Sequence, residues 1–220
     1  MKPLLICDCD EVLLHMARHF RVWLDESRDI DFRLPNHDFE TALRHRATGE
    51  QVGADEIREL IEAFFPAEMA RQTPVPHARE ALANLAEAAD VVILTNLLDH
   101  CREPRFEQLS AHGIFSHEVV CNQGPKGPAV ARLVAARRPS VAVFVDDLAR
   151  HHESVAEHAP QVHRLHMISE PELAPHIPPA PLAHARIDDW RDAARWIGAR
   201  FAAGAPAVFP EPVTKVEAKS

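Results

Sequence analysis

The sequence predicts an α/β fold: a doubly wound, mainly parallel sheet with helices on both faces and a small helical cap domain. Three observations predict it. Short, continuous apolar runs rich in Val, Ile and Leu suit parallel strands that helices cover on both faces. Segments with helical periodicity alternate with these runs. A long stretch also separates the first run from the second, in a chain of 220 residues that is 46% hydrophobic.

Five segments are predicted to be strands of this sheet. The clearest are residues 3–7 (PLLIC), 91–95 (VVILT) and 141–145 (VAVFV). Residues 118–121 (EVVC) and 162–168 (VHRLHMI) are weaker candidates, because polar residues interrupt or border their apolar runs. Each is short enough for a strand and too short for a typical helix.

Four segments between or after the strands have the pattern of helices. They are residues 76–89, 127–138, 148–159 and 188–201. The first is rich in Ala and Leu and opens with Pro76, a residue that is favoured in the first turn of a helix. We expect these helices to cover the two faces of the sheet.

The stretch after the first strand is too long for a simple crossover, which needs about a dozen residues. Residues 15–74 contain helix-like segments, and we expect them to form a helical cap that is inserted into a core of residues 1–14 and 75–200. Residues 73–76 (TPVP) are the expected hinge back into the core. Residues 201–220 are expected to be an extended or disordered tail.

Composition limits the classes of partner. The net charge of −9 gives no sign of the basic face that a nucleic-acid-binding protein usually shows. No apolar run approaches the roughly 18 residues of a membrane span, and the first run is too short for a signal peptide. The four cysteines are expected to be free thiols in a reducing cytosol. We therefore expect a soluble cytoplasmic protein, and a homodimer stays open.

Polar residues gather where the predicted strands end. They are Asp8, Asp10, Thr95, Asn96, Asp146 and Asp147, with Lys126 in the loop before a predicted helix. Ligands of open α/β sheets bind beyond the carboxyl ends of the strands. Four carboxylates in one crevice repel one another unless some are protonated or a cation lies among them. Oxygen ligands suit Mg²⁺, and the metal with Lys126 would attract a phosphate group.

Four short stretches resemble, in order, the motifs of the haloacid dehalogenase-like superfamily: DCDEV, ILTN, GPKGP and FVDD. The resemblance covers about residues 1–14 and 76–170. It implies that Asp8 is a nucleophile that forms an aspartyl-phosphate. It also implies that Asp10 is the general acid that protonates the leaving alcohol and then the base that activates water.

The resemblance assigns the remaining site residues as well. Thr95 and Lys126 would contact the transferring phosphoryl group, with the neighbouring Asn96 as a further substrate-binding residue. Mg²⁺ would be held by Asp146 and Asp147, together with Asp8 and the backbone carbonyl of Asp10 (all four are candidate metal residues). The electrostatic task of phosphoryl transfer would thus be shared between metal and lysine.

The implied function is a Mg²⁺-dependent phosphatase that hydrolyses a small phosphorylated metabolite. Asp10 favours phosphate substrates over haloacids, because a halide leaving group needs no proton. A phosphotransferase or phosphomutase could use the same intermediate, and the sequence does not name the acceptor. A non-catalytic binding module is the third reading. Its support is Glu11, which stands where such phosphatases usually have glycine.

Several histidines are further candidates for site residues. His15 and His19 lie four apart on a predicted helix, a spacing that can bind zinc, but the sequence shows no third ligand nearby. A surface or packing role is therefore expected for both. His151 and His152 follow the last motif and are expected to be exposed on their helix.

Overall fold

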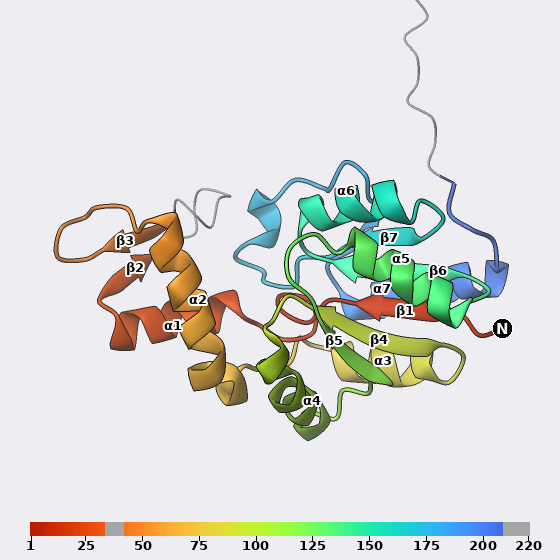
Figure 1. Ribbon diagram of the computed structural model, residues 1–220, viewed down its shortest axis with the longest axis horizontal. Coiled ribbons are helices and arrows are strands. Elements are labelled where there is room, and N and C mark those ends of the chain that lie inside the picture. The colour runs from red at the N-terminus through yellow and green to blue at the C-terminus, as the bar shows by residue number, and fades with distance from the viewer. Residues whose placement is uncertain (34–41, 209–220) are drawn as a thin grey trace, which may run out of the picture.

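A six-stranded parallel sheet forms the centre of the computed structural model, which describes residues 1–33 and 42–208 (Figure 1). The strand order is β5-β4-β1-β6-β7-β8, and every neighbouring pair is parallel. The strands are β1 (Leu4–Cys7), β4 (Asp90–Thr95), β5 (Glu118–Cys121), β6 (Ala142–Asp146), β7 (His163–His166) and β8 (Ala185–Arg186). The fold class and all five predicted strands are confirmed. The edge strand β8 was not predicted, because two residues carry no periodicity.

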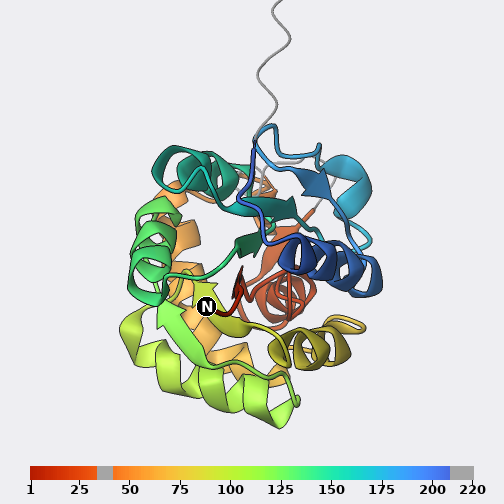
Figure 2. The same cartoon turned by 90° about the vertical axis from the view of Figure 1, so that its right-hand side faces the viewer.

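Helices cover both faces of this sheet, as Figure 2 shows. They are α3 (Ala78–Ala86) and α7 (Trp190–Ala203) on one face, and α5 (Gly127–Arg137) and α6 (Ala149–His158) on the other. The side chains of β1 alternate between the two layers. Leu5 and Cys7 belong to the apolar cluster that includes α3 and α7, whereas Leu4 and Ile6 belong to the cluster that includes α5 and α6. The doubly covered sheet explains why β1 is apolar at every position.

One helix was missed by the sequence analysis. Helix α4 (Arg102–Ala111) follows the short 3₁₀ helix η3 (Asp99–Cys101). Its buried residues are Arg105, Gln108 and Leu109. Because two of these three are polar, the segment lacks the apolar stripe by which an amphipathic helix is recognised.

The residues between β1 and α3 form a separate group of elements, which Figure 1 places at the end of the sheet toward which β1 runs. The group consists of α1 (Ala17–Ser27), β2 (Ile30–Phe32), β3 (Leu43–His45), α2 (Ala54–Glu68) and the 3₁₀ helix η2 (Met69–Arg71). We call residues 15–74 the cap. The antiparallel pair β2–β3 adds strands to a cap that was expected to be mainly helical. Residues 34–41 lie outside the described part.

Aromatic rings form the centre of the cap. The Phe64 ring lies 5.2 Å from that of Phe20 and 5.7 Å from that of Trp23, both edge to face. Such contacts are favourable beyond their buried area. Leu97 and Cys101, which follow β4 in the core, belong to the same buried cluster. The cap therefore packs directly against the segment that follows Thr95.

The chain enters and leaves the cap through two segments that lie side by side. The His15 N–H donates to the Thr73 carbonyl at 2.9 Å, and the Val75 N–H donates to the Leu13 carbonyl at 2.8 Å. Leu14 and Pro74 form an antiparallel bridge between these bonds. The expected hinge at 73–76 thus has the entering segment as its neighbour.

The C-terminal part departs slightly from expectation. Helix α7 continues to Ala203, so the expected tail from 201 onward begins inside a helix. Residues 204–208 have no regular structure, and residues 209–220 lie outside the described part. Within the described ranges, no helix combines the length and the apolar character that crossing a membrane requires.

A glycine at the start of α5 yields a test of the packing between α5 and α6. A Cβ on Gly127 would lie 2.1 Å from the backbone oxygen of Ser154 in α6. We expect Gly127→Ala to lower the free energy of unfolding by about 1–3 kcal/mol, because the two helices must separate. Urea denaturation measures this change.

Gly198→Ala is the matched control. Gly198 lies within α7, and a Cβ there would meet no atom within 4 Å. Alanine is the better helix former, so we expect this variant to gain up to about 1 kcal/mol. Equal stability of Gly127→Ala and the unmodified protein would contradict the close packing of α5 on α6.

Candidate active site

Polar side chains meet beyond the carboxyl ends of the three central strands. Asp8 directly follows β1, Thr95 ends β4 and Asp146 ends β6. The Asp8 N–H donates to the Val145 carbonyl at 2.9 Å, which extends the pairing of β1 with β6 by one residue. The parallel arrangement therefore brings together residues that are far apart in the sequence.

Lys126 joins two of the carboxylates. Its Nζ lies 2.7 Å from Asp8 Oδ1 and 2.7 Å from Asp146 Oδ2, and its side chain is 1% exposed. Burial by itself would lower the pKa of Lys126, but the two carboxylates outweigh it and raise that pKa above its usual range. The lysine is therefore a permanent positive charge in the crevice.

Negative charge exceeds positive charge at this point. Carboxylate oxygens of Asp8, Asp146 and Asp147 all lie within 4.8 Å of one another. Burial, then Asp146 and Asp8, raise the pKa of Asp147 well above its usual value. Burial also raises the pKa of Asp8 to about 6, although Lys126 opposes this shift. A divalent cation fits such a set of oxygens, and all-oxygen coordination suits Mg²⁺.

The side chain of Asp10 lies outside this carboxylate group and contacts a buried arginine. Arg105 Nη2 donates to Asp10 Oδ1 at 3.0 Å and to Oδ2 at 3.1 Å. Gln72 Nε2 donates to Asp10 Oδ1 at 3.0 Å, and the Thr95 hydroxyl lies 3.5 Å from Oδ2. An arginine has no acceptor, so both Asp10 oxygens act as acceptors in this arrangement.

This second polar group connects the core with the segment that leaves the cap. Arg105 Nη1 donates to Gln72 Oε1 at 3.1 Å and to Gln108 Oε1 at 2.9 Å. Gln72 lies between η2 and α3, so it belongs to the return segment of the cap. Sequence reasoning missed Arg105, Gln72 and Gln108. The signal that could have found Arg105 and Gln108 is a predominantly polar segment, 102–111, in a position where a crossover helix is required, whereas Gln72 carries no such signal.

Glu11 turns away from the carboxylate group and toward the cap. Its Oε1 accepts from the Met16 N–H at 2.7 Å and from the Ala17 N–H at 2.5 Å, so it caps the start of α1. Negative charge is favourable at a helix N-terminus. Burial raises the pKa of Glu11 to about 7. Its φ of 59° is a left-handed conformation, which explains why glycine is usual at this position.

The expectation that His151 and His152 are exposed is wrong. Both lie in the first turn of α6 and are at most 1% exposed. His152 Nε2 lies 3.0 Å from the Asp146 carbonyl, and His151 Nε2 lies 3.4 Å from Asn96 Nδ2. Burial lowers the pKa of His151 to about 3 and that of His152 to about 4, so both rings are neutral at pH 7.

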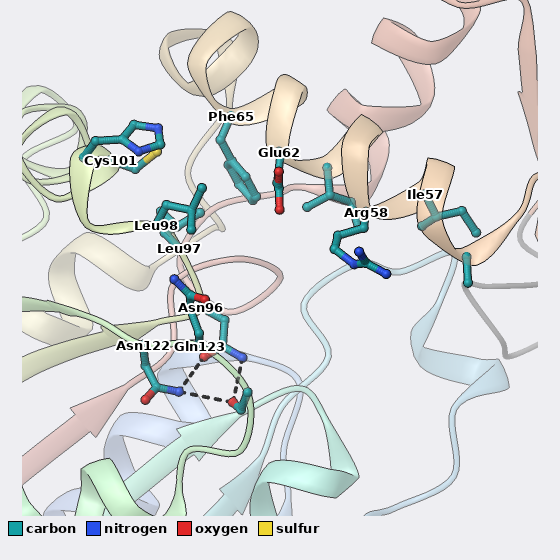
Figure 3. Close-up of a pocket in the computed structure, with 14 residues that line it drawn as sticks. Ile57, Arg58, Glu62, Phe65, Asn96, Leu97, Leu98, Cys101, Asn122 and Gln123 are labelled. Atoms are coloured by element: carbon teal, nitrogen blue, oxygen red, sulfur yellow. Dashed lines mark hydrogen bonds between the residues drawn. The ribbon is translucent and has the colours of Figure 1, made fainter.

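A cleft of about 420 Å³ opens between the cap and the core next to Asn96 (Figure 3). On the cap side it is lined by α2, with Ile57, Ile61 and Phe65 as apolar residues and Arg58 and Glu62 as charged ones. The core side consists of residues 96–98, 100–101 and 122–124.

Asn96 is fixed at the core side of this cleft by amide hydrogen bonds. Its Nδ2 donates to the Gly124 carbonyl at 3.0 Å, and its Oδ1 accepts from Asn122 Nδ2 at 2.9 Å, as Figure 3 shows. Because Asn96 follows Thr95, the cleft adjoins the polar groups at the strand ends.

Solved structures share this arrangement of elements. A haloacid dehalogenase-like protein of unknown function from Agrobacterium tumefaciens has a TM-score of 0.63 at 16% identity, over 89% of this chain and 97% of that one. A haloacid dehalogenase family hydrolase from Deinococcus radiodurans, solved with bound phosphate and sodium, has a TM-score of 0.58 at 16% identity, over 93% and 98%. An L-2-haloacid dehalogenase has a TM-score of 0.55 at 13% identity, over 90% and 100%.

The chain has the haloacid dehalogenase-like fold. No protein-family model and no curated protein matches the sequence. The haloacid dehalogenase-like fold hosts both dehalogenases and phosphate-binding hydrolases among the neighbours, so the choice between these chemistries has to come from the residues of the site.

Removal of Lys126 tests the charge balance of the crevice. We expect Lys126→Met to lower the free energy of unfolding by roughly 3–5 kcal/mol at pH 7, because buried carboxylates lose their partner. Burial raises the pKa of Asp8 to about 6 against the opposing effect of Lys126, so without the lysine Asp8 takes up its proton above pH 6. The loss should therefore shrink as the pH falls toward about 6.

Added Mg²⁺ should recover part of the stability of Lys126→Met, since it supplies positive charge at the same place. Urea denaturation at several pH values, with and without Mg²⁺, measures both effects. Lys2→Met, at an exposed site, is the control. A stability of Lys126→Met at pH 7 that equals that of this control would contradict the assigned charge balance.

Two substitutions of Glu11 separate its side-chain cap from its backbone conformation. Both Glu11→Ala and Glu11→Gly lose the cap on α1, which is worth about 0.5–2 kcal/mol. Only glycine relieves the left-handed conformation, which costs other residues roughly 1–2 kcal/mol. We therefore expect Glu11→Ala to be less stable than Glu11→Gly by about 1 kcal/mol in urea denaturation. The reverse order would show that the backbone at residue 11 is unstrained.

Proposed function

We propose that this protein is a Mg²⁺-dependent phosphatase that hydrolyses a small phosphomonoester through an aspartyl-phosphate. The observation that carries the proposal is the position of Asp8, which lies against Lys126 and within the carboxylate group of Asp146 and Asp147. The phosphate in the Deinococcus radiodurans neighbour supports the same substrate class.

Asp8 is the proposed nucleophile. Lys126 holds its Oδ1, which leaves Oδ2 as the oxygen that attacks phosphorus. The displaced alkoxide takes a proton, and water then attacks the aspartyl-phosphate to release inorganic phosphate and restore the Asp8 carboxylate. Bound Mg²⁺, held by Asp8, Asp146, Asp147 and the Asp10 carbonyl, would neutralise charge on the phosphoryl oxygens. Lys126 and the Thr95 hydroxyl would contact these oxygens as well.

Asp10 is the proposed general acid and base. In the described arrangement its oxygens accept from Arg105 and Gln72. To donate a proton to the leaving alcohol, the carboxyl must turn out of these bonds. Gln72 belongs to the return segment of the cap, so a movement of the cap over the substrate would release one of them. This links the position of the cap to the acid that the reaction requires.

The site also bears on the alternatives. A dehalogenase needs no acid at residue 10, whereas here Thr95, Arg105 and Gln72 all surround that carboxylate. The binding-module alternative loses its support, because Glu11 points toward α1 and leaves the crevice uncrowded. A phosphotransferase or phosphomutase shares every proposed step except the acceptor. The half-apolar cleft suits a small phosphorylated metabolite as the substrate.

Phosphate release from p-nitrophenyl phosphate tests the proposal. We expect activity that requires Mg²⁺, and a loss of roughly 10³-fold or more in Asp8→Asn, because the amide is not a nucleophile. Asp192→Asn, on the exposed side of α7, is the matched control and should keep full activity.

A panel of metabolite phosphates, with and without candidate acceptor alcohols, would then distinguish hydrolysis from phosphoryl transfer. Measurement of halide release from 2-haloacids tests the dehalogenase alternative. Undiminished activity of Asp8→Asn would overturn the nucleophile, and no phosphate release over the whole panel would favour a binding module.

A further inference from the structure

A second group of ionisable side chains lies at the entrance to the cap, apart from the carboxylate group. Glu11, His15 and Glu170 come from the segment after β1, the start of the cap and the loop after β7. Their exposed fractions are 7%, 4% and 3%. One potential ligand atom from each lies within 4.8 Å of the other two.

Two of these atoms lack the hydrogen bonds that buried polar atoms normally make. Glu11 Oε2 and His15 Nδ1 have no hydrogen-bond partner in the part of the chain that the structure describes. A buried polar atom without a partner costs about 1–3 kcal/mol. Glu11 cannot turn to relieve this, because its Oε1 is bonded to two N–H groups of α1.

The third member of the group is held firmly in place. Arg18 Nε donates to Glu170 Oε2 at 2.7 Å, and Arg18 Nη2 donates to Oε1 at 3.0 Å. The neighbouring Ser169 donates to the Glu11 carbonyl through its N–H and its hydroxyl. Metal-binding carboxylates are commonly oriented by hydrogen bonds of this kind.

We propose that Glu11, His15 and Glu170 bind a divalent transition metal ion, of which Zn²⁺ is the best fit. One imidazole nitrogen and two carboxylate oxygens are ligands that Zn²⁺ accepts, whereas Mg²⁺ prefers oxygen alone. His15 Nδ1 lies 3.5 Å from Glu170 Oε2. Two ligands of a tetrahedral zinc with bonds of about 2.0–2.2 Å lie roughly 3.4 Å apart. The metal would satisfy both unpartnered atoms at once.

The protonation of His15 agrees with this geometry. Burial, then the positive charge of Arg18, lower the pKa of His15 to about 4, although Glu170 opposes the shift. The ring is therefore neutral at pH 7, as a metal ligand must be. His19, the partner that the sequence suggested, is directed elsewhere, since its Nε2 lies 3.0 Å from the Thr73 hydroxyl.

Metal titration of the full chain tests the proposal. The protein is stripped with a chelator and titrated with Co²⁺ and with Zn²⁺ in an excess of Mg²⁺, which occupies all-oxygen sites. We expect one tightly bound Co²⁺ or Zn²⁺ per chain, followed by the visible absorption of Co²⁺ and by elemental analysis. His15→Gln and Glu170→Gln should weaken this binding by roughly 100-fold or more, as loss of even an indirect partner costs about 10–100-fold.

Two controls locate the ion. His19→Gln removes a histidine of the same helix outside the group and should bind the metal as the unmodified protein does. Asp146→Asn removes an oxygen from the proposed Mg²⁺ site and should also keep the Co²⁺. Loss of Co²⁺ in Asp146→Asn together with its retention in His15→Gln would overturn the proposal, because the metal would then lie at Asp8.

Absence of a tight Co²⁺ or Zn²⁺ site in the unmodified protein would also overturn it. In Glu170→Gln the amide oxygen can still accept a hydrogen bond from Arg18. This variant therefore serves as the second one if His15→Gln does not fold. Thermal unfolding of each metal-free variant reports whether it is folded. None of these readouts depends on phosphatase activity.

Discussion

The repulsion among the carboxylates at the ends of β1 and β6 is the constraint on which the rest of the structure depends. Asp8, Asp146 and Asp147 can lie this close only because a lysine and, as proposed, a metal ion offset their charge. Lys126 has to reach them from the start of α5, and α5 can approach only because Gly127 has no side chain to meet α6. The helix layer on that face of the sheet is thus arranged around a charge balance.

A second charge balance lies between the core and the cap. Arg105 is buried and Asp10 is partly buried, and an ion pair in such surroundings needs partners for its other polar atoms. Arg105 Nε lacks one among the described residues. Gln72 and Gln108 supply the required acceptors for Arg105 Nη1. Helix α4 therefore presents a polar face to the interior, and the return segment of the cap is fixed by hydrogen bonds as well as by apolar packing.

Local sequence patterns explain which parts could be predicted. The strands were visible because both faces of the sheet are covered, which leaves uninterrupted apolar runs. The polar residues at the strand ends could be predicted because they lie in four short motifs that follow one another in a recognisable order. The roles of Arg105 and Glu170 could not be found in this way, because the residues that they contact, Asp10 and His15 among them, lie far away in the sequence. The exposure of His151 was predicted wrongly because a polar side chain suggests a surface position. The residue is instead buried at the start of α6, next to Asn96. The direction of the Glu11 side chain could not be predicted, because the backbone conformation that directs it toward α1 leaves no mark in the sequence.

The shared apolar cluster of the cap has a consequence for how this architecture can diversify. Leu97 and Cys101 follow a strand of the core, yet they belong to the same buried apolar cluster as Phe64 of the cap. A cap from another protein, joined at residues 15 and 74, would have to pack against Leu97 and Cys101, whose shapes suit the present cap. A working chimera would have to carry residues 97–101 with the graft, so recombination at the two hinge points alone is a poor route to new specificity.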